Sequence, residues 1–183
     1  MNVQPVPGAE RAALRDRRLV HRLQHGDAEA LQQIYHRYKE DLLTVAMSLL
    51  GDTQEAEDCV HDVFVHFAEA PTDLRVNRSL RGYLVRCVAN RARNVLQRRH
   101  LQPGPSIDEP ESLDCPVRGS VASEESEQIF EALAQLPPEQ REVITLHIHG
   151  QMRFREIAQQ LELSINTVQS RYRYGIERLR TLL

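Results

Sequence analysis

The sequence predicts an all-α protein, built as two small helical domains joined by a flexible linker. Apolar residues recur at helical spacing along most of the 183 residues, and no stretch of useful length alternates as a strand would. The stretch 101–127 lacks this period and holds four prolines, two glycines and seven acids, a composition typical of a flexible chain. We therefore expect an N-terminal tail over 1–12, a first domain over 13–100, an acidic linker over 101–125 and a second domain over 126–183.

Composition argues against membrane-spanning and disulfide-rich secreted proteins. The net charge is only −3, aromatic residues make up 5% and Trp is missing, so any core is expected to be aliphatic. No apolar run approaches the ~18 residues of a membrane span, and the polar N-terminus lacks the apolar region of a signal peptide. The cysteines Cys59, Cys87 and Cys115 are odd in number and lack CxxC spacing, which favours reduced thiols and a cytoplasmic location.

A first helix is expected between Asp27 and Gly51. Asp27 is a suitable N-cap, and Gly51 is a suitable C-terminal stop because glycine adopts the left-handed conformation easily. Between them the apolar residues fall on one stripe of a helix. This stripe consists of Leu31, Ile34, Tyr38, Leu42, Val45 and Leu49.

The next predicted helix carries five carboxylates, a cysteine and a histidine within the fourteen residues GDTQEAEDCVHDVF. Asp52, with Glu55 three residues later, resembles a capping box. The apolar face consists of Ala56, Cys59, Val60, Val63 and Phe67. The opposite face consists of Gln54, Glu57, Asp58, His61 and Val65, with Phe64 at its margin.

Several interpretations of this charged helix compete. Cys59, Asp62 and His66 share an edge, but Cys59 and His66 lie two turns apart, ~10 Å along the axis, too far to bind one metal ion. Paired carboxylates for acid–base catalysis lack an accompanying nucleophile or phosphate-binding loop. The outward acidic face with its apolar edge suits a basic partner protein, and helix geometry alone leaves a plain solvated surface open as well.

The third predicted helix, residues 79–98, is rich in arginine. From Leu74 to His100 there are eight arginines and no acid. The buried stripe consists of Leu80, Leu84, Cys87, Val88, Ala92 and Val95. The three helices are expected to form a small bundle, since their apolar faces can be buried only against one another.

The opposite face of this helix has the chemistry of a nucleic-acid surface. Arginine neutralises phosphate and stacks on bases, asparagine and glutamine pair with base edges, and tyrosine offers a stacking platform. An ordinary solvated helix would carry glutamates among these positions, and this helix carries none. The candidate DNA-binding residues, with those of the lead-in LRVNRSLRGY, are Arg75, Asn77, Arg78, Arg81, Tyr83, Arg86, Asn90, Arg93 and Gln97.

The second domain contains a helix-turn-helix pattern in MRFREIAQQLELSINTVQSRYRYGIERLRTLL. Two short helical patterns flank a tight turn at 162–164, and Ser164 is a suitable N-cap for the second. Upstream, residues 129–150 supply two supporting helices, the second begun by two prolines. The inward residues are Phe154, Ile157, Ala158, Leu161, Ile165, Val168, Tyr172, Ile176 and Leu179. The outward residues of the second helix, which suit a major groove, are Asn166, Thr167, Gln169, Ser170, Arg171, Arg173 and Tyr174.

The helical segments described above, in their order along the chain, resemble those of a bacterial extracytoplasmic-function (ECF) sigma factor, a two-domain member of the sigma-70 family. The family's sigma-2 domain is similar to LVHRLQHGDAEALQQIYHRY, LLGDTQEAEDCVHDVF and LRGYLVRCVANRARNVLQRR. Its sigma-4 domain is similar to LAQLPPEQREVITLHIHG and FREIAQQLELSINTVQSRYRYGIERLR. The resemblance covers most of the chain, with only the N-terminal tail and the linker outside it.

The resemblance implies a function and partners. The chain would bind core RNA polymerase and direct it to promoters, without a cofactor or a catalytic activity of its own, and an anti-sigma factor would be a further partner. The acidic helix would dock on the polymerase clamp helices through its outward face. The loop 70–79, with the arginine helix, would melt and read the minus-ten promoter element, and the helix from Ser164 would read the minus-thirty-five element.

The chain departs from the family at several positions. Arg153 stands where Ser or Thr is usual, so the first helix of the helix-turn-helix lacks its usual N-cap. Glu162 replaces the usual turn glycine, at a cost of about 1 kcal/mol if its backbone is left-handed. Ala89 replaces a common arginine on the arginine helix.

Two other classes of protein also have to be weighed. A helix-turn-helix regulator that never touches polymerase would account for the second domain and leave the acidic and arginine helices unexplained. A helical enzyme or metalloprotein finds no supporting motif.

Overall fold

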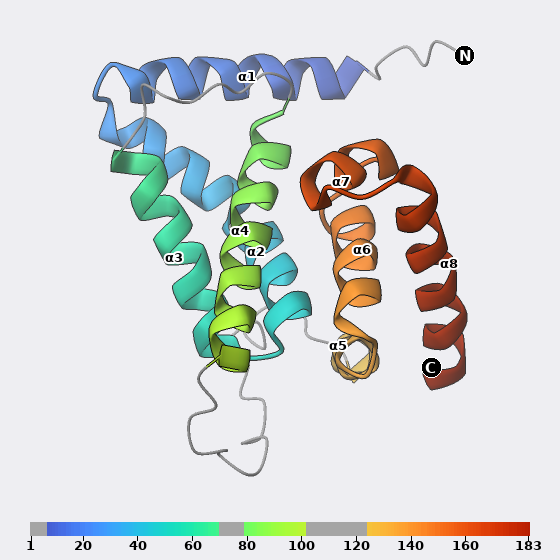
Figure 1. Cartoon of the computed structure of the whole chain (residues 1–183). Coiled ribbons are helices and arrows are strands. Elements are labelled where there is room, and N and C mark those ends of the chain that lie inside the picture. The colour runs from blue at the N-terminus through green and yellow to red at the C-terminus, as the bar shows by residue number, and fades with distance from the viewer. Residues whose placement is uncertain (1–6, 70–78, 102–123) are drawn as a thin grey trace.

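The computed structural model describes residues 7–69, 79–101 and 124–183, and these ranges contain helices and no strand. The predicted all-α class is confirmed. Of the predicted linker 101–125, residues 102–123 lie outside the described residues. The helices (Figure 1) are α1 Pro7–Gln24, α2 Ala28–Leu50, α3 Thr53–Glu69, α4 Leu80–Leu101, α5 Glu124–Ala134, α6 Pro138–Ile148, α7 Phe154–Leu161 and α8 Ile165–Leu182.

Helix α2 is the centre of the first block of helices, with α1, α3 and α4 packed around it. It buries nearly all of the predicted stripe, and its last six residues, 45–50, are buried on every side. The caps are those predicted. The Asp27 carboxylate accepts hydrogen bonds from the backbone N–H groups of Glu29 and Ala30, and Gly51 ends the helix with a left-handed φ of 69°.

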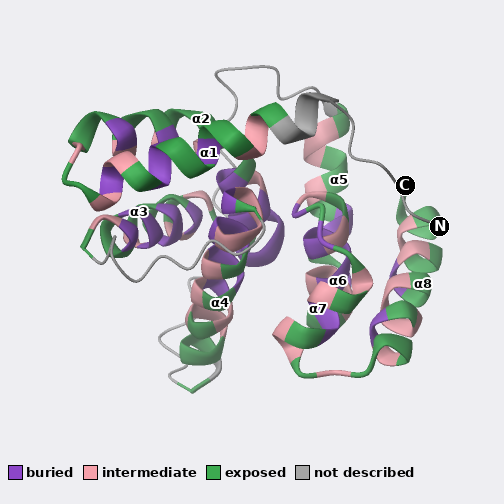
Figure 2. Cartoon of the chain, turned by 90° about the horizontal axis from the view of Figure 1, so that it is seen from above, coloured by how far each residue is buried: buried purple, intermediate pink, exposed green. Residues whose placement is uncertain are grey.

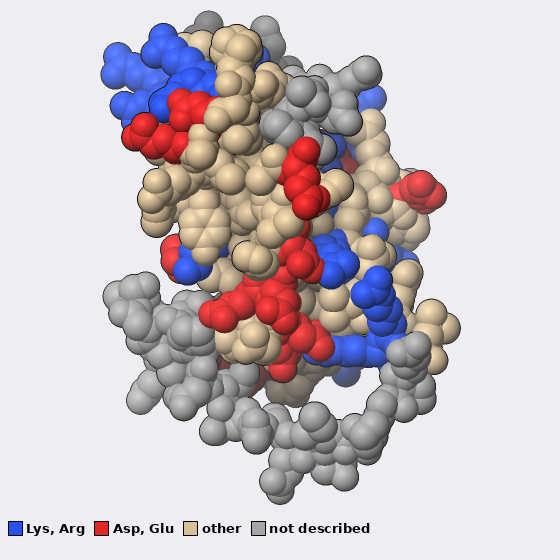
Figure 3. Space-filling model, turned by 90° about the vertical axis from the view of Figure 1, so that its left-hand side faces the viewer, with Lys and Arg blue, Asp and Glu red and all other residues tan. Residues whose placement is uncertain are grey.

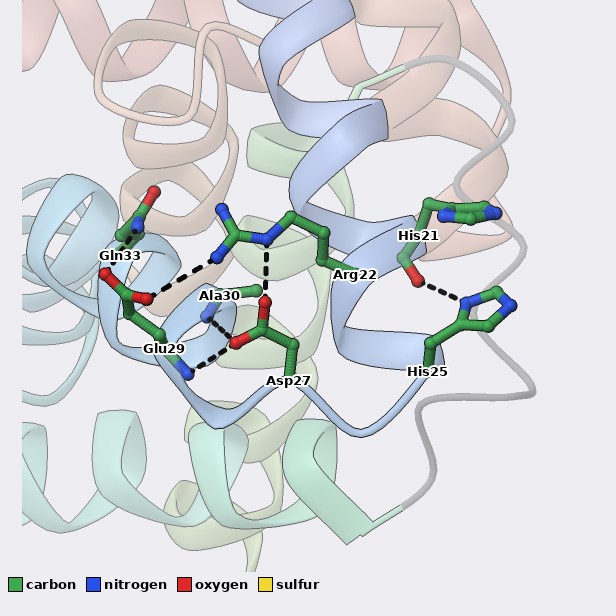
Figure 4. Close-up of polar contacts among 7 residues, drawn as sticks. All are labelled: His21, Arg22, His25, Asp27, Glu29, Ala30 and Gln33. Atoms are coloured by element: carbon green, nitrogen blue, oxygen red, sulfur yellow. Dashed lines mark hydrogen bonds and ion pairs between the residues drawn. The ribbon is translucent and has the colours of Figure 1, made fainter.

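Polar contacts hold the junction between α1 and α2 (Figure 4). Arg22 donates through Nε to Asp27 Oδ2 at 2.7 Å, and its Nη2 lies 3.7 Å from the Glu29 carboxylate. The hydrogen bond from Arg22 lowers the pKa of Asp27, which keeps this capping carboxylate ionised. On the other side of the turn, His25 Nδ1 donates to the backbone oxygen of His21 at 2.8 Å.

Helix α1 begins at Pro7, so residues 7–12 of the predicted N-terminal tail are helical. The apolar stripe of α1 lies further along the helix, within the predicted first domain, and is buried in the core shared with α2. It consists of Leu19, Val20 and Leu23. Asp16 is buried with it, accepts a hydrogen bond from the Tyr38 hydroxyl at 2.6 Å and lies 3.3 Å from Arg37 Nη1.

Helices α5 to α8 form the second block. Two prolines begin α6, as predicted. Helix α7, a tight turn and α8 form the helix-turn-helix, and the Ser164 hydroxyl caps α8 by accepting from the Thr167 N–H at 3.0 Å. Gly175 allows α8 to approach α6 closely, because a Cβ at this position would lie 2.6 Å from Ile144 Cδ1.

An aromatic cluster ties three helices of the second block together. The His147 ring of α6 stacks on Phe154 of α7 and meets the edge of Tyr172 of α8, with ring centroids 4.3 Å and 4.9 Å apart. His147 Nδ1 also donates to the backbone oxygen of Met152 at 2.8 Å. The ring is thereby held in one orientation at the centre of the block.

The two blocks pack against each other. The sequence predicted a bundle of three helices, α2, α3 and α4, whereas α1 of the first block and α6 of the second block also pack on α2. Helix α6 lies against α2, and the buried core continues from the first block into Val143, Leu146 and Met152. Figure 2 shows buried residues in both blocks of helices. Val85 and Ala89 of α4 lie outside the predicted buried stripe and are nevertheless fully buried. The expectation that the helix faces could be buried only against one another is therefore wrong, since α1 and α6 also cover them.

Candidate polymerase and DNA interfaces

The outward face of α3 contains the residues predicted for it, and all are exposed: Gln54, Glu57, Asp58, His61 and Val65. Figure 3 looks onto this side of the molecule. Acidic side chains gather in its lower half, where α3 begins, and a group of basic side chains lies at its upper edge, near α1. Val65 is 42% exposed and gives the acidic face an apolar edge. Such a surface suits a basic partner protein.

The opposite face of α3 is core, and all five residues of the predicted apolar face are buried. Phe64, predicted at the margin of the exposed face, is buried instead because its ring packs edge-on against Tyr35, with centroids 4.9 Å apart. The Cys59 thiol donates to the backbone oxygen of Val88 at 3.6 Å. Burial raises the pKa of Cys59 to about 12, so it is a core thiol with little thiolate character.

Tertiary packing divides the carboxylates of α3 into two sets. Asp52 accepts from the Glu55 N–H at 2.7 Å, which is the first half of the predicted capping box. The Glu55 carboxylate does not complete the box and pairs with α4 instead. The two ion pairs to α4 are Glu55–Arg99 and Asp62–Arg91. Glu57 and Asp58 form no ion pair with any described residue, which leaves their charges available to a partner.

Helix α4 exposes part of the predicted DNA-binding surface. Arg86, Asn90 and Gln97 are exposed, and Tyr83 is half-buried, with its ring centroid 6.2 Å from that of Phe67. The exposed side chains combine a charge for phosphate with amides for base edges. Three residues of the predicted surface lie outside the described residues, namely Arg75, Asn77 and Arg78.

Two arginines of the predicted DNA-binding surface, Arg81 and Arg93, are half-buried and contact the second block. Arg81 donates to the backbone oxygens of Gly150 and His149 at 2.9 Å and 2.7 Å. Arg93 donates to Glu142 Oε1 at 2.6 Å. Sequence reasoning missed these partners because they lie 49 to 69 positions along the chain, beyond the reach of any local pattern.

The outward face of α8 has the predicted composition. Four of its residues are exposed, namely Asn166, Gln169, Arg173 and Tyr174, and three are half-buried, namely Thr167, Ser170 and Arg171. The Arg173 guanidinium lies over the Tyr174 ring at 4.9 Å and donates to its hydroxyl at 3.2 Å. Ile165, predicted to face inward, is 42% exposed, because it lies in the first turn of α8, before the helix meets the core at Val168.

The helix-turn-helix keeps its geometry at Arg153 and Glu162, the two positions within it that differ from the usual family residues. The Arg153 side chain has no acceptor for the N-terminus of α7, and Glu156 compensates by accepting from the Arg153 N–H at 2.9 Å. Glu162 has a φ of 55°. This is the left-handed conformation for which the sequence analysis expects backbone strain. The Leu163 N–H then bonds to the Ala158 oxygen at 2.9 Å and closes the turn.

Helix α1 adds a basic surface that the sequence reasoning did not assign. The arginines Arg11, Arg15, Arg17 and Arg18 are all exposed. Their density within one short segment was the available signal in the sequence.

Comparison with known proteins gives these surfaces a context. The family model for Sigma-70 region 2 matches residues 34–101, and the model for Sigma-70, region 4 matches residues 126–179. The RNA polymerase sigma-H factor of Pseudomonas aeruginosa is 26% identical over 168 residues, covering 85% of this chain and 87% of that protein. The ECF RNA polymerase sigma factor SigW of Bacillus subtilis is 25% identical over 178 residues, covering 90% and 94%.

A solved structure agrees with the sequence comparisons. CnrH, in a complex with the cytosolic domain of CnrY, is similar with a TM-score of 0.66 at 25% identity, covering 92% of this chain and 96% of that chain. Within the described ranges, no helix is long and apolar enough to cross a membrane. The region 2 match contains the acidic and arginine helices, and the region 4 match contains the helix-turn-helix. The chain therefore belongs to the sigma-70 family of RNA polymerase sigma factors, in the ECF group of its relatives.

Proposed function

We propose that this sigma factor divides its work among three surfaces. A sigma factor binds core RNA polymerase and directs it to promoters, where transcription begins. In our proposal the outward face of α3 binds core polymerase, α4 with the preceding segment binds the minus-ten element, and the outward face of α8 binds the minus-thirty-five element. Each surface carries the chemistry of its partner and lies on a different helix.

The main support for assigning polymerase binding to the outward face of α3 is the different environment of its carboxylates. Two of its carboxylates neutralise arginines of α4, whereas Glu57 and Asp58 stand on the exposed side beside Val65. Acidic groups that no internal cation neutralises attract a basic surface and increase the rate of encounter with it. A helix-turn-helix regulator without polymerase would not need this face, and it would leave the region 2 match unexplained.

We also propose that an anti-sigma factor regulates the chain in the cytoplasm. The structural relative CnrH was solved with the cytosolic domain of CnrY, and a similar complex is expected for this chain. The proposal assigns no cofactor and no catalytic residue to the chain, because in a holoenzyme the polymerase carries out RNA synthesis.

The polymerase assignment is tested by charge reversal on α3. Glu57→Lys with Asp58→Lys is expected to weaken binding to core polymerase by about tenfold or more, since like charges then face the partner. Thermal stability should change little, because both side chains are exposed and make no ion pair with a described residue; Asp58 accepts only a long hydrogen bond from Gln54 Nε2, at 3.5 Å. Core affinity is measured by titrating labelled core enzyme with the sigma factor.

A matched control reverses two exposed carboxylates elsewhere, Glu40 and Glu131, which gives the same change in net charge. Glu40→Lys with Glu131→Lys should leave core affinity near that of the original chain. If the double reversal on α3 behaves like this control, the face of α3 is only a solvated surface.

A further inference from the structure

Helix α1 presents a stripe of arginines to solvent on the side opposite its core residues. Arg11, Arg15 and Arg18 follow one another at intervals of four and three positions, so they share one face of the helix, and Arg17 lies at its edge. All four side chains are exposed, and together they are called the arginine stripe below. From Arg11 to the end of α1 the only acid is Asp16, which is buried. The charged side chains exposed along this part of α1 are therefore all basic.

No arginine of the stripe forms an ion pair with a described residue. Arg22, one turn further along the same helix, behaves differently, because it is paired with Asp27 and Glu29 at the junction with α2. An ordinary solvated helix carries glutamates three or four positions from such arginines, and they neutralise the charge. Positive charges that no internal acid neutralises attract a partner of opposite charge.

The arginine stripe adjoins the start of α4, where the proposed minus-ten surface begins. Helix α1 lies across the end of the first block at which α4 starts, and the two helices are in contact (Figure 1). Arg17 of α1 lines a pocket together with Ser79, Leu80 and Arg81 at the start of α4. The two helices thus form one continuous surface at this end of the molecule. A DNA strand bound along α4 would reach α1 next.

DNA phosphates suit the arginine stripe better than a membrane does. The helix rises roughly 10 Å from Arg11 to Arg18, which is about the length over which one DNA strand carries three phosphates. Arginine binds phosphate through a planar fork of donors. A helix that lies on a membrane needs a broad apolar face, whereas Leu14 is the only large apolar side chain exposed along the described part of α1.

We propose that the arginine stripe of α1 binds phosphates of the promoter DNA that flanks the minus-ten element, an inference that rests on the minus-ten role proposed above for α4. The region 2 match begins at residue 34, so α1 lies outside it and the match assigns this helix no role. Contacts to phosphates position a protein on DNA without reading bases. The stripe therefore adds affinity and holds the DNA on the first block, and it leaves the choice of sequence to α4 and α8.

The stripe is tested in the holoenzyme with two single-stranded oligonucleotides, whose affinities are measured by fluorescence anisotropy. The short one holds the minus-ten element alone, and the long one adds about ten nucleotides of mixed sequence on each side, roughly 34 Å of strand. Arg15→Ala with Arg18→Ala should leave the affinity for the short oligonucleotide within about twofold near 0.1 M salt. The same variant should bind the long one about tenfold more weakly. Its slope of log affinity against log salt should fall by about 1.4, since each lost contact to a single strand contributes about 0.7.

The matched control is Arg15→Lys with Arg18→Lys, which keeps both charges and should retain most of the affinity and the salt slope. Equal losses of the alanine variant on both oligonucleotides would mean that net charge alone is responsible, and the proposal would then be wrong. Core affinity of the same variant is titrated in parallel. A loss there would assign the arginines to an acidic surface of polymerase and remove them from DNA.

Arg86→Ala separates a failure of the stripe from a failure of the minus-ten surface. Arg86 is exposed on α4, outside the stripe, and its removal should weaken binding of both oligonucleotides severalfold. A loss from Arg86→Ala, with no loss from the alanine variant of the stripe on the long oligonucleotide, would overturn the stripe and leave the minus-ten surface standing. Unchanged binding by Arg86→Ala would overturn that surface and the inference about α1 with it.

Discussion

At the scale of single residues, Glu162 carries measurable backbone strain. Its φ of 55° places a residue with a Cβ in the left-handed region, in the tight turn between α7 and α8. Glu162→Gly is expected to raise the free energy of unfolding by about 1 kcal/mol, equivalent to roughly 2–4 °C in Tm. Urea and thermal unfolding of the free chain measure the effect.

The control for this prediction is the same substitution in a right-handed helix. Glu177 is exposed on α8, and Glu177→Gly is expected to lower stability by about 1 kcal/mol because glycine loses more backbone entropy there. Similar losses from both substitutions would mean that the turn accommodates a left-handed glutamate without strain.

His149 connects stability to pH. Burial lowers the pKa of its imidazole, and the Arg81 guanidinium nearby lowers it further. Because the folded pKa lies below the ordinary value of 6.5, the unfolded chain binds more protons, and stability rises with pH in this window. The contribution of His149 is complete above pH 6.5 and is lost as the pH falls through its folded pKa.

Urea unfolding between about pH 7.5 and pH 5 measures this loss. His149→Gln is expected to flatten the pH dependence, since glutamine does not titrate. His66→Gln, a substitution of an exposed histidine on α3, controls for the change of side chain. If both variants keep the slope of the original chain, the acid sensitivity arises elsewhere in the protein.

At the scale of the element, α8 is expected to separate base contacts from phosphate contacts along its length. Arg173 lies on the exposed face near the middle of the helix, where base edges would lie in a major groove. Contacts to bases specify and contacts to phosphates position. Arg173→Ala is therefore expected to cost ~1–3 kcal/mol on the preferred minus-thirty-five element and to narrow its margin over altered elements.

Arg178, exposed more than one turn further along α8, is the matched control. Arg178→Ala should weaken binding to all sequences about equally and reduce the salt slope by about one. Each mutant holoenzyme is measured on promoters that differ only in the minus-thirty-five element. A uniform loss from Arg173→Ala would assign Arg173 to phosphate and remove it from the bases.

Elements were predictable where the relevant forces are local. The caps at Asp27 and Ser164, the stop at Gly51 and the two faces of α3 depend on residues at most a few positions apart, and the structure agrees with each. The sequence predictions were wrong for residues at the margin of a helix face and in the first turn of a helix. Phe64 turned inward because Tyr35 of another helix covers it, and such a neighbour leaves no trace in the local period.

At the scale of the whole molecule, the packing of the two blocks determines which of the predicted DNA-binding side chains are exposed. The sequence placed Arg81 and Arg93 among the DNA-binding residues from their helical position alone. The structure places both against the second block, where a backbone turn and Glu142 accept their hydrogen bonds. Under the proposed function, DNA would have to replace these contacts before either arginine could bind a phosphate.

The sequence by itself determined the helical class, most of the helices, their caps and the chemistry of the three surfaces. These properties depend on the helical period and on short-range hydrogen bonds, and both are determined by residues close together in the sequence. Only the tertiary structure decided which charged residues remain available. Glu55, Asp62, Arg81 and Arg93 look like surface charges in the sequence, yet each is paired with a residue 29 or more positions away. Such partners are chosen by packing between helices, which the period of any one helix does not specify.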